Sequence, residues 1–405
     1  MPTLPTSTPL PAQPTALPTD IAPLAPSVIT LTIWTTEAFS PTQTITSGQI
    51  LAQEVAEFEA SQSDVRLEFV LKKPYGKGGI LDYLLTTGAV VPELLPDIVV
   101  MDVDELRTAV QAELVYPLDE LLPPDLISDL YPFALQSSTF ERRLYGLQYQ
   151  ADVEHWVYDT GRMAIPPSSW PGVLSNPGPS IFPAGGQASL VNDAFLIQYL
   201  AVRPWPVEGG ADTSFLETDR LAAVLQYYQD GLSRGIFPAD ILDYQTTNDC
   251  WREYLTRQIA TAQVSAHQYL AERHRAQNSA PAPIPAINGP AAPLNRGWVL
   301  ALVTPDPVRQ SAAAELMSQL LAPETNAAWN QSTHYLPTRQ AALALWDPED
   351  SYGPFIHQQL QATRPRPVIP NYAQTAAAMQ QAVEDVLTGV ATPDEAAAQA
   401  VESVQ

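Results

Sequence analysis

Lysine and cysteine are both scarce in this chain. Lys72, Lys73 and Lys77 are its three lysines, all within the stretch KKPYGKGG, and Cys250 is its single cysteine. One thiol can form no internal disulfide and leaves no second sulfur for a metal site. The glycines beside the lysines suggest a phosphate cradle, but the stretch lacks the ordered Gly-Lys-Ser/Thr ending of a P-loop. We therefore interpret it as a solvated loop.

Positive charge is scarce as well. Twenty basic side chains face forty-four acidic ones, which gives a formal net charge of -24. Such a chain repels phosphate backbones and anionic membrane surfaces, so we expect no nucleic-acid partner. No stretch reaches the length of about 18 apolar residues that is typical of a membrane-spanning helix. The five histidines lack the i, i+4 spacing of a zinc helix, and no metal or cofactor is expected.

The N-terminal residues 1–27 are rich in proline and threonine and lack hydrophobic periodicity. This composition is typical of an extended, polyproline-like tether. No charged segment followed by an apolar segment comes after Met1, so no secretory signal is visible. A tether before a globular body makes sense if an anchor precedes it. We therefore expect an extracytoplasmic protein whose chain follows a removed signal peptide or a lipidated cysteine.

The rest of the chain alternates strand and helix patterns. Its length exceeds what one hydrophobic core usually serves, which favours two lobes. Strand patterns at 28–36, 65–71 and 96–102 alternate with helix patterns at 48–60 and 79–88. This order predicts a parallel α/β sheet, and ligands gather at the carboxyl ends of such strands. Trp34, Glu37, Asp102 and Asp104 fall at these ends.

Further elements follow in the second part of the chain. Strands are expected at 155–159 and 259–265 and from Trp298 onward, and helices at 169–174, at 192–201 and from about Asp219 to Gly231. Later helix patterns occupy 307–322, 323–333, 372–387 and the segment from Pro393. The segment PLNRGWVLAL places a large aromatic residue, Trp298, just where a strand begins.

Eight segments together, in this order, resemble the extracellular solute-binding proteins of ABC importers, in the sugar-binding family that includes maltose-binding protein. They are LTIW, PDIVVMDVDEL, ELVYPLDELL, YGLQYQADVEHWVYD, SWPGVL, RGWVLAL, AAELMSQLLAPETNAAWNQSTHYLPTR and VEDVLTGVATPDEAAAQA. The resemblance covers essentially Val28 to the C-terminus. Its most specific part is the pair LAPETNAAWNQSTHYLPTR and LTGVATPDEA.

The resemblance implies a two-lobed periplasmic-binding-protein fold of type II, in which a hinge joins two α/β lobes around a ligand cleft. The first lobe would comprise residues 28–148 and 301–342, and the second 149–300 and 343–405. Ligand binding would stabilise a closed arrangement, because only a closed cleft lets both lobes touch the solute. The implied function is to capture a sugar or oligosaccharide and deliver it to the permease subunits of the transporter.

The resemblance also implies a set of ligand-binding residues. A sugar offers an apolar ring face and a girdle of hydroxyls, so its site needs flat aromatic side chains flanked by carboxylates and amides. Trp298 stands where the similar proteins carry Gly-Gly-Trp, with Arg296 in place of the first glycine. The full implied set is Trp34, Glu37, Asp102, Asp104, Tyr149, Gln150, Asp152, Asn192, Phe195, His267, Arg296, Trp298, Tyr335 and Tyr372.

Several of these positions have ordinary structural interpretations. Trp34 and Phe195 also suit a core, Glu37 and Asp102 suit a loop, and Tyr335 can pack against a helix end. His267 replaces a tryptophan that many similar proteins have, and alanines near Ala376 replace another stacking aromatic. We therefore expect the pocket not to be a maltodextrin site.

Other functions remain open at this stage. The same fold can bind a polyamine, a peptide or another small molecule, and Glu37, Asp102, Asp104 and Asp152 could surround an ammonium chain. It could also serve a surface sensor without transport. A glycosidase would need two carboxylates such as Asp102 and Asp152 about 5 to 9 Å apart. The sequence has no nucleophile elbow and no metal helix, so we do not expect an enzyme.

Overall fold

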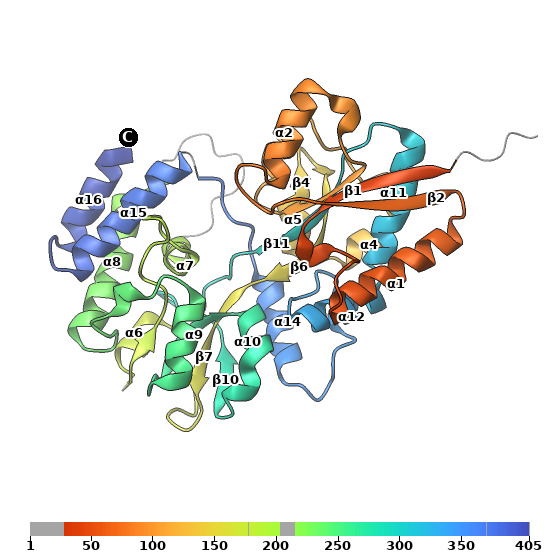
Figure 1. The fold of residues 1–405 in the computed structure, drawn as a ribbon. Coiled ribbons are helices and arrows are strands. Elements are labelled where there is room, and N and C mark those ends of the chain that lie inside the picture. The colour runs from red at the N-terminus through yellow and green to blue at the C-terminus, as the bar shows by residue number, and fades with distance from the viewer. Residues whose placement is uncertain (1–27, 177, 203–214, 370, 405) are drawn as a thin grey trace, which may run out of the picture.

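The computed structural model describes residues 28–404 except 177, 203–214 and 370. The described residues form two lobes side by side, each built on its own β-sheet (Figure 1). The tether expected at residues 1–27 lies outside the described residues. In the described ranges, none of the helices combines the length and the apolar character that crossing a membrane requires.

The first lobe contains a five-stranded sheet in the order β2-β1-β3-β11-β6. β1 lies parallel to β2 and β3, as the sequence predicts, whereas β11 runs antiparallel to its neighbours β3 and β6. β11 comes from much later in the chain, so a distant segment completes this sheet. The strands are β1 (Ile29–Thr35), β2 (Val65–Leu71), β3 (Ile98–Asp102), β6 (Gly146–Asp152) and β11 (Arg296–Leu302).

Helices cover both faces of this sheet. The side chains of Ile98 and Val100 belong to the cluster on one face, and those of Val99 and Met101 to the cluster on the other. This alternation explains why β3 is apolar throughout: a strand buried on both faces has no solvated side. The helices of this lobe are α1 (Thr46–Ser61), α2 (Ile80–Val90), α3 (Leu106–Gln111), α4 (Pro124–Asp129), α5 (Pro132–Ser138), α11 (Pro307–Leu320), α12 (Pro323–Thr333) and α13 (Gln340–Leu343), beside a short hairpin of β4 (Thr139–Phe140) and β5 (Arg143–Leu144).

The second lobe has a four-stranded sheet in the order β10-β7-β9-β8. Its strands are β7 (Glu154–Asp159), β8 (Ser180–Ile181), β9 (Thr261–Ser265) and β10 (Ser279–Ala282). In Figure 1, α8, α15 and α16 lie together at the outer end of this lobe. Its helices are α6 (Trp170–Leu174), α7 (Asp193–Ala201), α8 (Thr218–Ser233), α9 (Thr247–Thr256), α10 (Ala266–Glu272), α14 (Tyr352–Ala362), α15 (Tyr372–Leu387) and α16 (Pro393–Val404).

One helix end differs from the expectation. Gly231 was expected to end α8, but the helix continues to Ser233. A Cβ at position 231 would lie 2.1 Å from the ring of Phe237. The glycine is therefore required by a close contact between a helix and the following loop, and not by a helix stop.

The chain crosses between the two sheets at three places. β6 leads directly into β7 through Val153, residues 283–295 connect β10 back to β11, and the segment that contains α14 returns toward the second lobe. β6 and β11 thus lie in the first sheet and end or begin at the boundary between the lobes. The domain limits implied by the resemblance stay a prediction.

Candidate functional site

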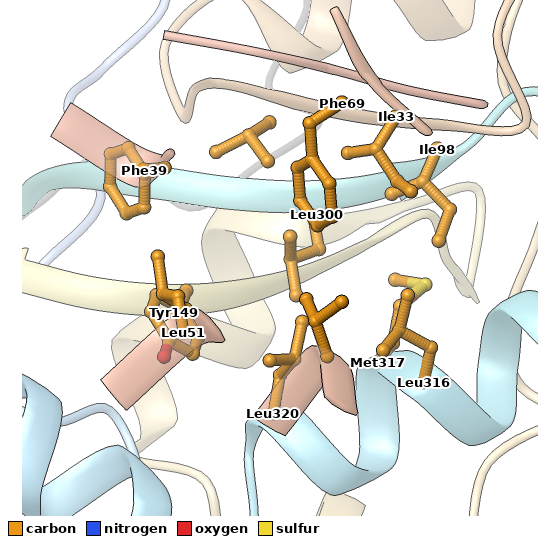
Figure 2. Close-up of a pocket in the computed structure, with 12 residues that line it drawn as sticks. Ile33, Phe39, Leu51, Phe69, Ile98, Tyr149, Leu300, Leu316, Met317 and Leu320 are labelled. Carbon is orange, nitrogen blue, oxygen red and sulfur yellow. The ribbon is translucent and has the colours of Figure 1, made fainter. Parts of the chain in front are cut away.

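A small cavity inside the first lobe is part of the core and not a binding site. It has a volume of about 30 Å³, enough for one or two water molecules. Its walls are apolar, as Figure 2 shows, and the cavity lies between the first sheet and helices α1 and α11. The lining residues include Ile33, Phe39, Leu51, Phe69, Ile98, Tyr149, Leu300, Leu316, Met317 and Leu320. A polar solute finds no partner there.

A much larger cavity lies between the two lobes. Its volume of about 660 Å³ falls in the range of ordinary small-molecule sites, which is about 300 to 1,000 Å³. Strands β3, β6 and β11 of the first sheet, the start of α7 with the residues just before it, and the segment before α15 contribute to it. The lining residues are Tyr75, Asp102, Asp104, Glu105, Gln150, Asp152, Gln187, Leu190, Val191, Asn192, Asp193, Arg296, Gly297, Trp298, Tyr335, Arg366 and Tyr372.

Strand register places the centre of this cavity. Trp298 on β11 pairs with Asp102 on one neighbour and Gln150 on the other, and Arg296 pairs with Asp152. A strand spacing of about 4.8 Å therefore brings an acid, an aromatic ring and an amide into one row. The pairing of β11 and β6 shifts between Trp298 and Val299, which is typical of a bulge that redirects a side chain.

Gly297 permits this close pairing. A Cβ at this position would lie 2.1 Å from the carbonyl oxygen of Gln150 and 2.5 Å from Nε2 of Gln148. Any other residue would force β11 away from β6. The glycine in the RGW segment is thus explained by the approach of two backbones at the floor of the cavity.

Aromatic side chains form part of the wall. The ring centroids of Tyr75 and Trp298 are 5.8 Å apart at an interplanar angle of 46°, and Phe39 supports the other side of Trp298 at 5.5 Å. Tyr335 stacks on His267 with centroids 4.1 Å apart and planes 14° apart. These contacts hold the rings of Trp298 and Tyr335 in place before any ligand arrives.

Two arginines converge on one buried carboxylate. Arg296 Nε lies 2.6 Å from Asp193 Oδ2, and Arg366 forms an ion pair with the other oxygen of Asp193. The Asp193 side chain is only 3% exposed. Burial alone would raise the pKa of Asp193, but the charges of Arg366 and Arg296 outweigh it and hold the pKa below its ordinary value. The cluster therefore satisfies both oxygens of the buried Asp193 carboxylate.

Arg366 also reaches across the cavity. Its Nε lies 3.0 Å from Asp104 Oδ2, within ion-pair distance although the pair is not aligned as a hydrogen bond. Asp104 follows β3 in the first lobe, whereas Asp193 begins α7 in the second. The guanidinium therefore links carboxylates from both lobes.

The acids after β3 have the opposite character. Burial raises the pKa of Asp104 to about 6 against the charge of Arg366, although the Asp104 side chain is still 43% exposed to the water of the cavity. Burial, followed by repulsion from Asp102 and Asp104, raises the pKa of Glu105 to about 7. Asp102 itself accepts hydrogen bonds from the Tyr75 hydroxyl at 2.7 Å and from the Asp104 backbone N–H at 2.8 Å.

The acid at the lobe boundary is Asp152. Its Oδ1 accepts a hydrogen bond from the backbone N–H of His267 at 3.0 Å. Burial nevertheless raises its pKa, with His267 and Arg296 opposing that effect. Backbone hydrogen bonds between Ala151 and Leu336 bring the loop that carries Tyr335 to the same place. Among the described residues, no group of three or more His, Cys, Asp or Glu side chains is arranged to hold a metal ion.

Residues 53–352 match the family model described as bacterial extracellular solute-binding protein. The chain belongs to this family. A search of curated proteins finds no match to this binding protein.

Solved structures show the same fold. The cyclic alpha-maltosyl-1,6-maltose binding protein from Arthrobacter globiformis is 20% identical, with 93% of this binding protein and 98% of that chain covered and a TM-score of 0.70. The sugar-binding protein MalE from Xanthomonas citri is 17% identical over 93% and 96% of the two chains, with a TM-score of 0.71. MalE3 from T. maritima, solved with maltose, is 18% identical over 93% and 99%, with a TM-score of 0.67. These likenesses confirm the two-lobed fold.

The binding protein brings most of the predicted site residues to one cavity. Nine of them line it: Asp102, Asp104, Gln150, Asp152, Asn192, Arg296, Trp298, Tyr335 and Tyr372. Their contact with a ligand stays a prediction. For Asn192, the side chain also has a structural role, because it accepts a hydrogen bond from Phe195 N–H and donates one to the Gly185 carbonyl at the start of α7.

Five predicted residues do not line the cavity. Trp34 is buried in the first sheet's second cluster beneath Lys72, and Tyr149 is buried against Phe39 and Trp329 on the opposite face. Trp34 contacts Tyr83 and Lys72, and Tyr149 contacts Phe39 and Trp329, so both rings pack against side chains of the first lobe. The others are accounted for as follows: Phe195 is in the core against Tyr228, Glu37 is exposed and accepts a hydrogen bond from Gln43, and His267 stands behind Tyr335.

Sequence reasoning missed other lining residues, above all Tyr75, Glu105, Asp193 and Arg366. Tyr75 lies within the lysine-containing loop, which was interpreted only as solvated. Asp193 was passed over for its neighbour Asn192, and Arg366 lies in a proline-rich segment, TRPRPVIP, without a regular pattern. The signal that could have identified Arg366 is its position between two prolines shortly before a helix. Its partners Asp104 and Asp193 are far away in the sequence, so this position alone does not predict the ion pairs.

Proposed function

We propose that this chain is the substrate-binding component of an ABC importer, which captures a saccharide between its lobes and presents it to the permease. The observation that carries this proposal is the cavity itself, where the half-buried ring of Trp298 lies in one row with Asp102 and Gln150. A ring face and a girdle of hydroxyls need just such an aromatic surface beside hydrogen-bonding groups. The similar structures are a cyclic alpha-maltosyl-1,6-maltose binding protein, MalE3 with bound maltose and the sugar-binding protein MalE, which supports the same class.

Capture would work by closure of the lobes. Arg366 already pairs with carboxylates from both lobes, so small rotations between the lobes change its surroundings. A solute that touches both walls favours the closed arrangement by its differential affinity for that state. The permease would then recognise the closed form.

A thermal-shift screen tests the proposal directly. Mono- and oligosaccharides are compared with polyamines and short peptides, and calorimetry follows on any hit. A ligand at 100 times its dissociation constant stabilises the folded state by about 2.7 kcal/mol, which this assay detects. If no saccharide raises the melting temperature while a peptide does, the proposed solute class is wrong and the fold assignment stands.

We also propose that the saccharide is released unchanged. Asp102 and Asp152 both line the cavity, so a glycoside-acting enzyme is the alternative to exclude. Chromatography after overnight incubation with an oligosaccharide that binds should return it intact. Appearance of shorter sugars, abolished by Asp152→Asn, would establish hydrolysis instead.

The location of the protein outside the cytoplasm follows from its family, and we propose that residues 1–27 tether it to a membrane through a lipidated N-terminus. The proline- and threonine-rich composition of this segment supports the tether. Mass spectrometry of the protein isolated from its native membrane would detect the lipid. A mature N-terminus without lipid modification would rule the anchor out.

A further inference from the structure

The charges in the cavity do not balance. Among the described residues, five carboxylates line it, from Asp102, Asp104, Glu105, Asp152 and Asp193, whereas the basic side chains are Arg296 and Arg366. No lysine is among the lining residues. If every group is ionised, the wall carries three more negative charges than positive ones. A neutral solute leaves this excess in place.

The two arginines are already engaged. Both pair with the buried Asp193, and Arg366 also lies beside Asp104. The two arginines thus hold the second lobe's wall together and link it to the first, and the charge of Arg296 also acts on Asp152. Asp102, Glu105 and Asp152 also line the cavity, and no cationic side chain of the described residues lies within ion-pair distance of them.

Two buried acceptors without a partner belong to residues that line the same cavity. Gln150 is only 2% exposed, lines the cavity, and has no hydrogen-bond partner for its Oε1. An unsatisfied buried acceptor costs about 1 to 3 kcal/mol until a donor reaches it. One oxygen of Glu105, Oε2, is likewise buried without a partner. Two buried acceptors of the lining residues thus have no donor, and the lining carries more negative than positive charge.

The aromatic wall suits a cation as well as a sugar ring. Trp298 and Tyr75 lie close to each other at 46°, and the Tyr75 hydroxyl donates to Asp102. Their rings therefore lie next to the carboxylates that lack a cation. An ammonium group beside such rings gains attraction from the ring faces and from the acids together. A bare metal ion does not fit, because the acids of the described residues are not gathered around one point.

We propose that the solute is a saccharide that carries a protonated amine, seated against Asp102, Glu105 and Gln150 with a sugar ring on Trp298. This inference rests on the proposed saccharide function and narrows it. The ammonium supplies the missing positive charge and up to three N–H donors in one group. The hydroxyls and ring supply the contacts that any sugar would make.

Calorimetry with two sugar series, each in three matched forms, tests this. Mono- to trisaccharides of the glucose and galactose series are each compared with a hydroxyl, an N-acetylamino or a free amino group at C2, and spermidine is added as a cation without a sugar. The amino sugars should bind about tenfold more tightly than both neutral forms, as expected for one hydrogen-bonded charge pair. Their advantage should shrink as salt is raised, while binding of neutral sugars should not change.

Variants locate the amine. Glu105→Gln and Asp102→Asn keep the shape of each side chain and should remove most of the preference for the amino form over the two neutral forms. Glu68→Gln is the matched control, because Glu68 is an exposed acid on β2 of the same lobe and does not line the cavity. Unfolding curves establish that each variant is folded.

The outcomes separate this inference from the proposed function. If neutral sugars bind as tightly as amino sugars, the amine is wrong and saccharide capture stands. If spermidine binds and no saccharide does, both the saccharide function and its amino-sugar form are wrong. A preference for amines that survives both cavity substitutions also overturns the placement against Asp102 and Glu105.

Discussion

The two walls of the cavity contain the same kind of side chain in opposite electrostatic states. Asp193, at the start of α7, is almost fully buried, and its pKa is held low by two guanidinium groups. Asp104 and Glu105, after β3, have raised pKa values of about 6 and about 7 because burial and mutual repulsion disfavour their charge. One wall is complete without a ligand, and the other gains stability if a donor or a cation arrives. The comparison thus distinguishes a carboxylate with a structural role from carboxylates available for binding.

The largest expected effect comes from removing the paired acid. Asp193→Asn should lower the free energy of unfolding by about 3 kcal/mol, because two arginines lose the charge that compensates them. Urea denaturation at pH 7 measures this loss. Glu105→Gln is the matched substitution on the other wall and should leave stability unchanged or higher, since burial already disfavours that charge. If both variants lose the same free energy of unfolding, the two walls do not differ in how their carboxylates contribute to stability.

Removing the aromatic ring between the walls should affect binding more than folding. Trp298→Ala should weaken the affinity for a saccharide by about thirtyfold, the effect of an interface residue worth about 2 kcal/mol. Because Trp298 is half-buried, some stability is lost as well. Trp34→Ala is the control: it removes a ring buried in the core, so it should lower stability by about 3 to 5 kcal/mol and leave affinity intact. Calorimetry measures the affinity and urea denaturation the stability of both variants. An affinity loss for Trp34→Ala as large as that for Trp298→Ala would contradict the prediction.

The walls should also respond differently to pH. Glu105 binds a proton more tightly in the folded protein, with a pKa of about 7 against its ordinary value of 4.5, so its contribution to stability is full below about pH 4.5 and is lost as pH rises through 7. Asp193 has a lowered pKa, so its contribution is lost as pH falls below its ordinary range. The stability of Glu105→Gln should therefore fall less steeply than that of the unaltered protein between these pH values.

Other groups titrate in the same range but remain in both proteins. Glu105 faces Asp102 and Asp104 on its own loop and Tyr75 from the neighbouring one, and Glu154 at the start of β7 has a pKa raised to about 7 by its own burial. Comparing denaturation curves of the variant and the unaltered protein at each pH isolates Glu105. Parallel curves from pH 4.5 to 7 would show that its charge is not disfavoured in the folded protein.

The smallest expected effect concerns a segment that belongs to neither wall. Deleting residues 1–26 should leave ligand affinity unchanged, because a tether contributes reach and no contacts. Calorimetry on the shortened chain measures this against the full chain. A change in affinity beyond experimental error would show that the segment takes part in binding.

Much of the local structure was predictable from the sequence. The β-branched runs of β1, β2 and β3 and the helical periods of α1, α2 and α15 identify these elements within a few residues. Hydrophobic period depends on neighbouring residues alone, which is why it can be detected without tertiary information. The family resemblance supplied the two-lobed arrangement that these periods do not reveal.

The candidate site was harder to predict from the sequence. The sequence by itself determined that Asp102 and Asp104 follow a strand, that Trp298 begins one, and that the chain is strongly acidic. Only the tertiary structure decided that β11 lies between β3 and β6, which brings Trp298 beside Asp102 and Gln150, and that Arg366 meets Asp104 and Asp193. These partners are separated by up to hundreds of residues, and neither period nor propensity carries information over such distances. The charge of each acid likewise follows from its surroundings, because burial and neighbouring charges, and not residue type, set its pKa.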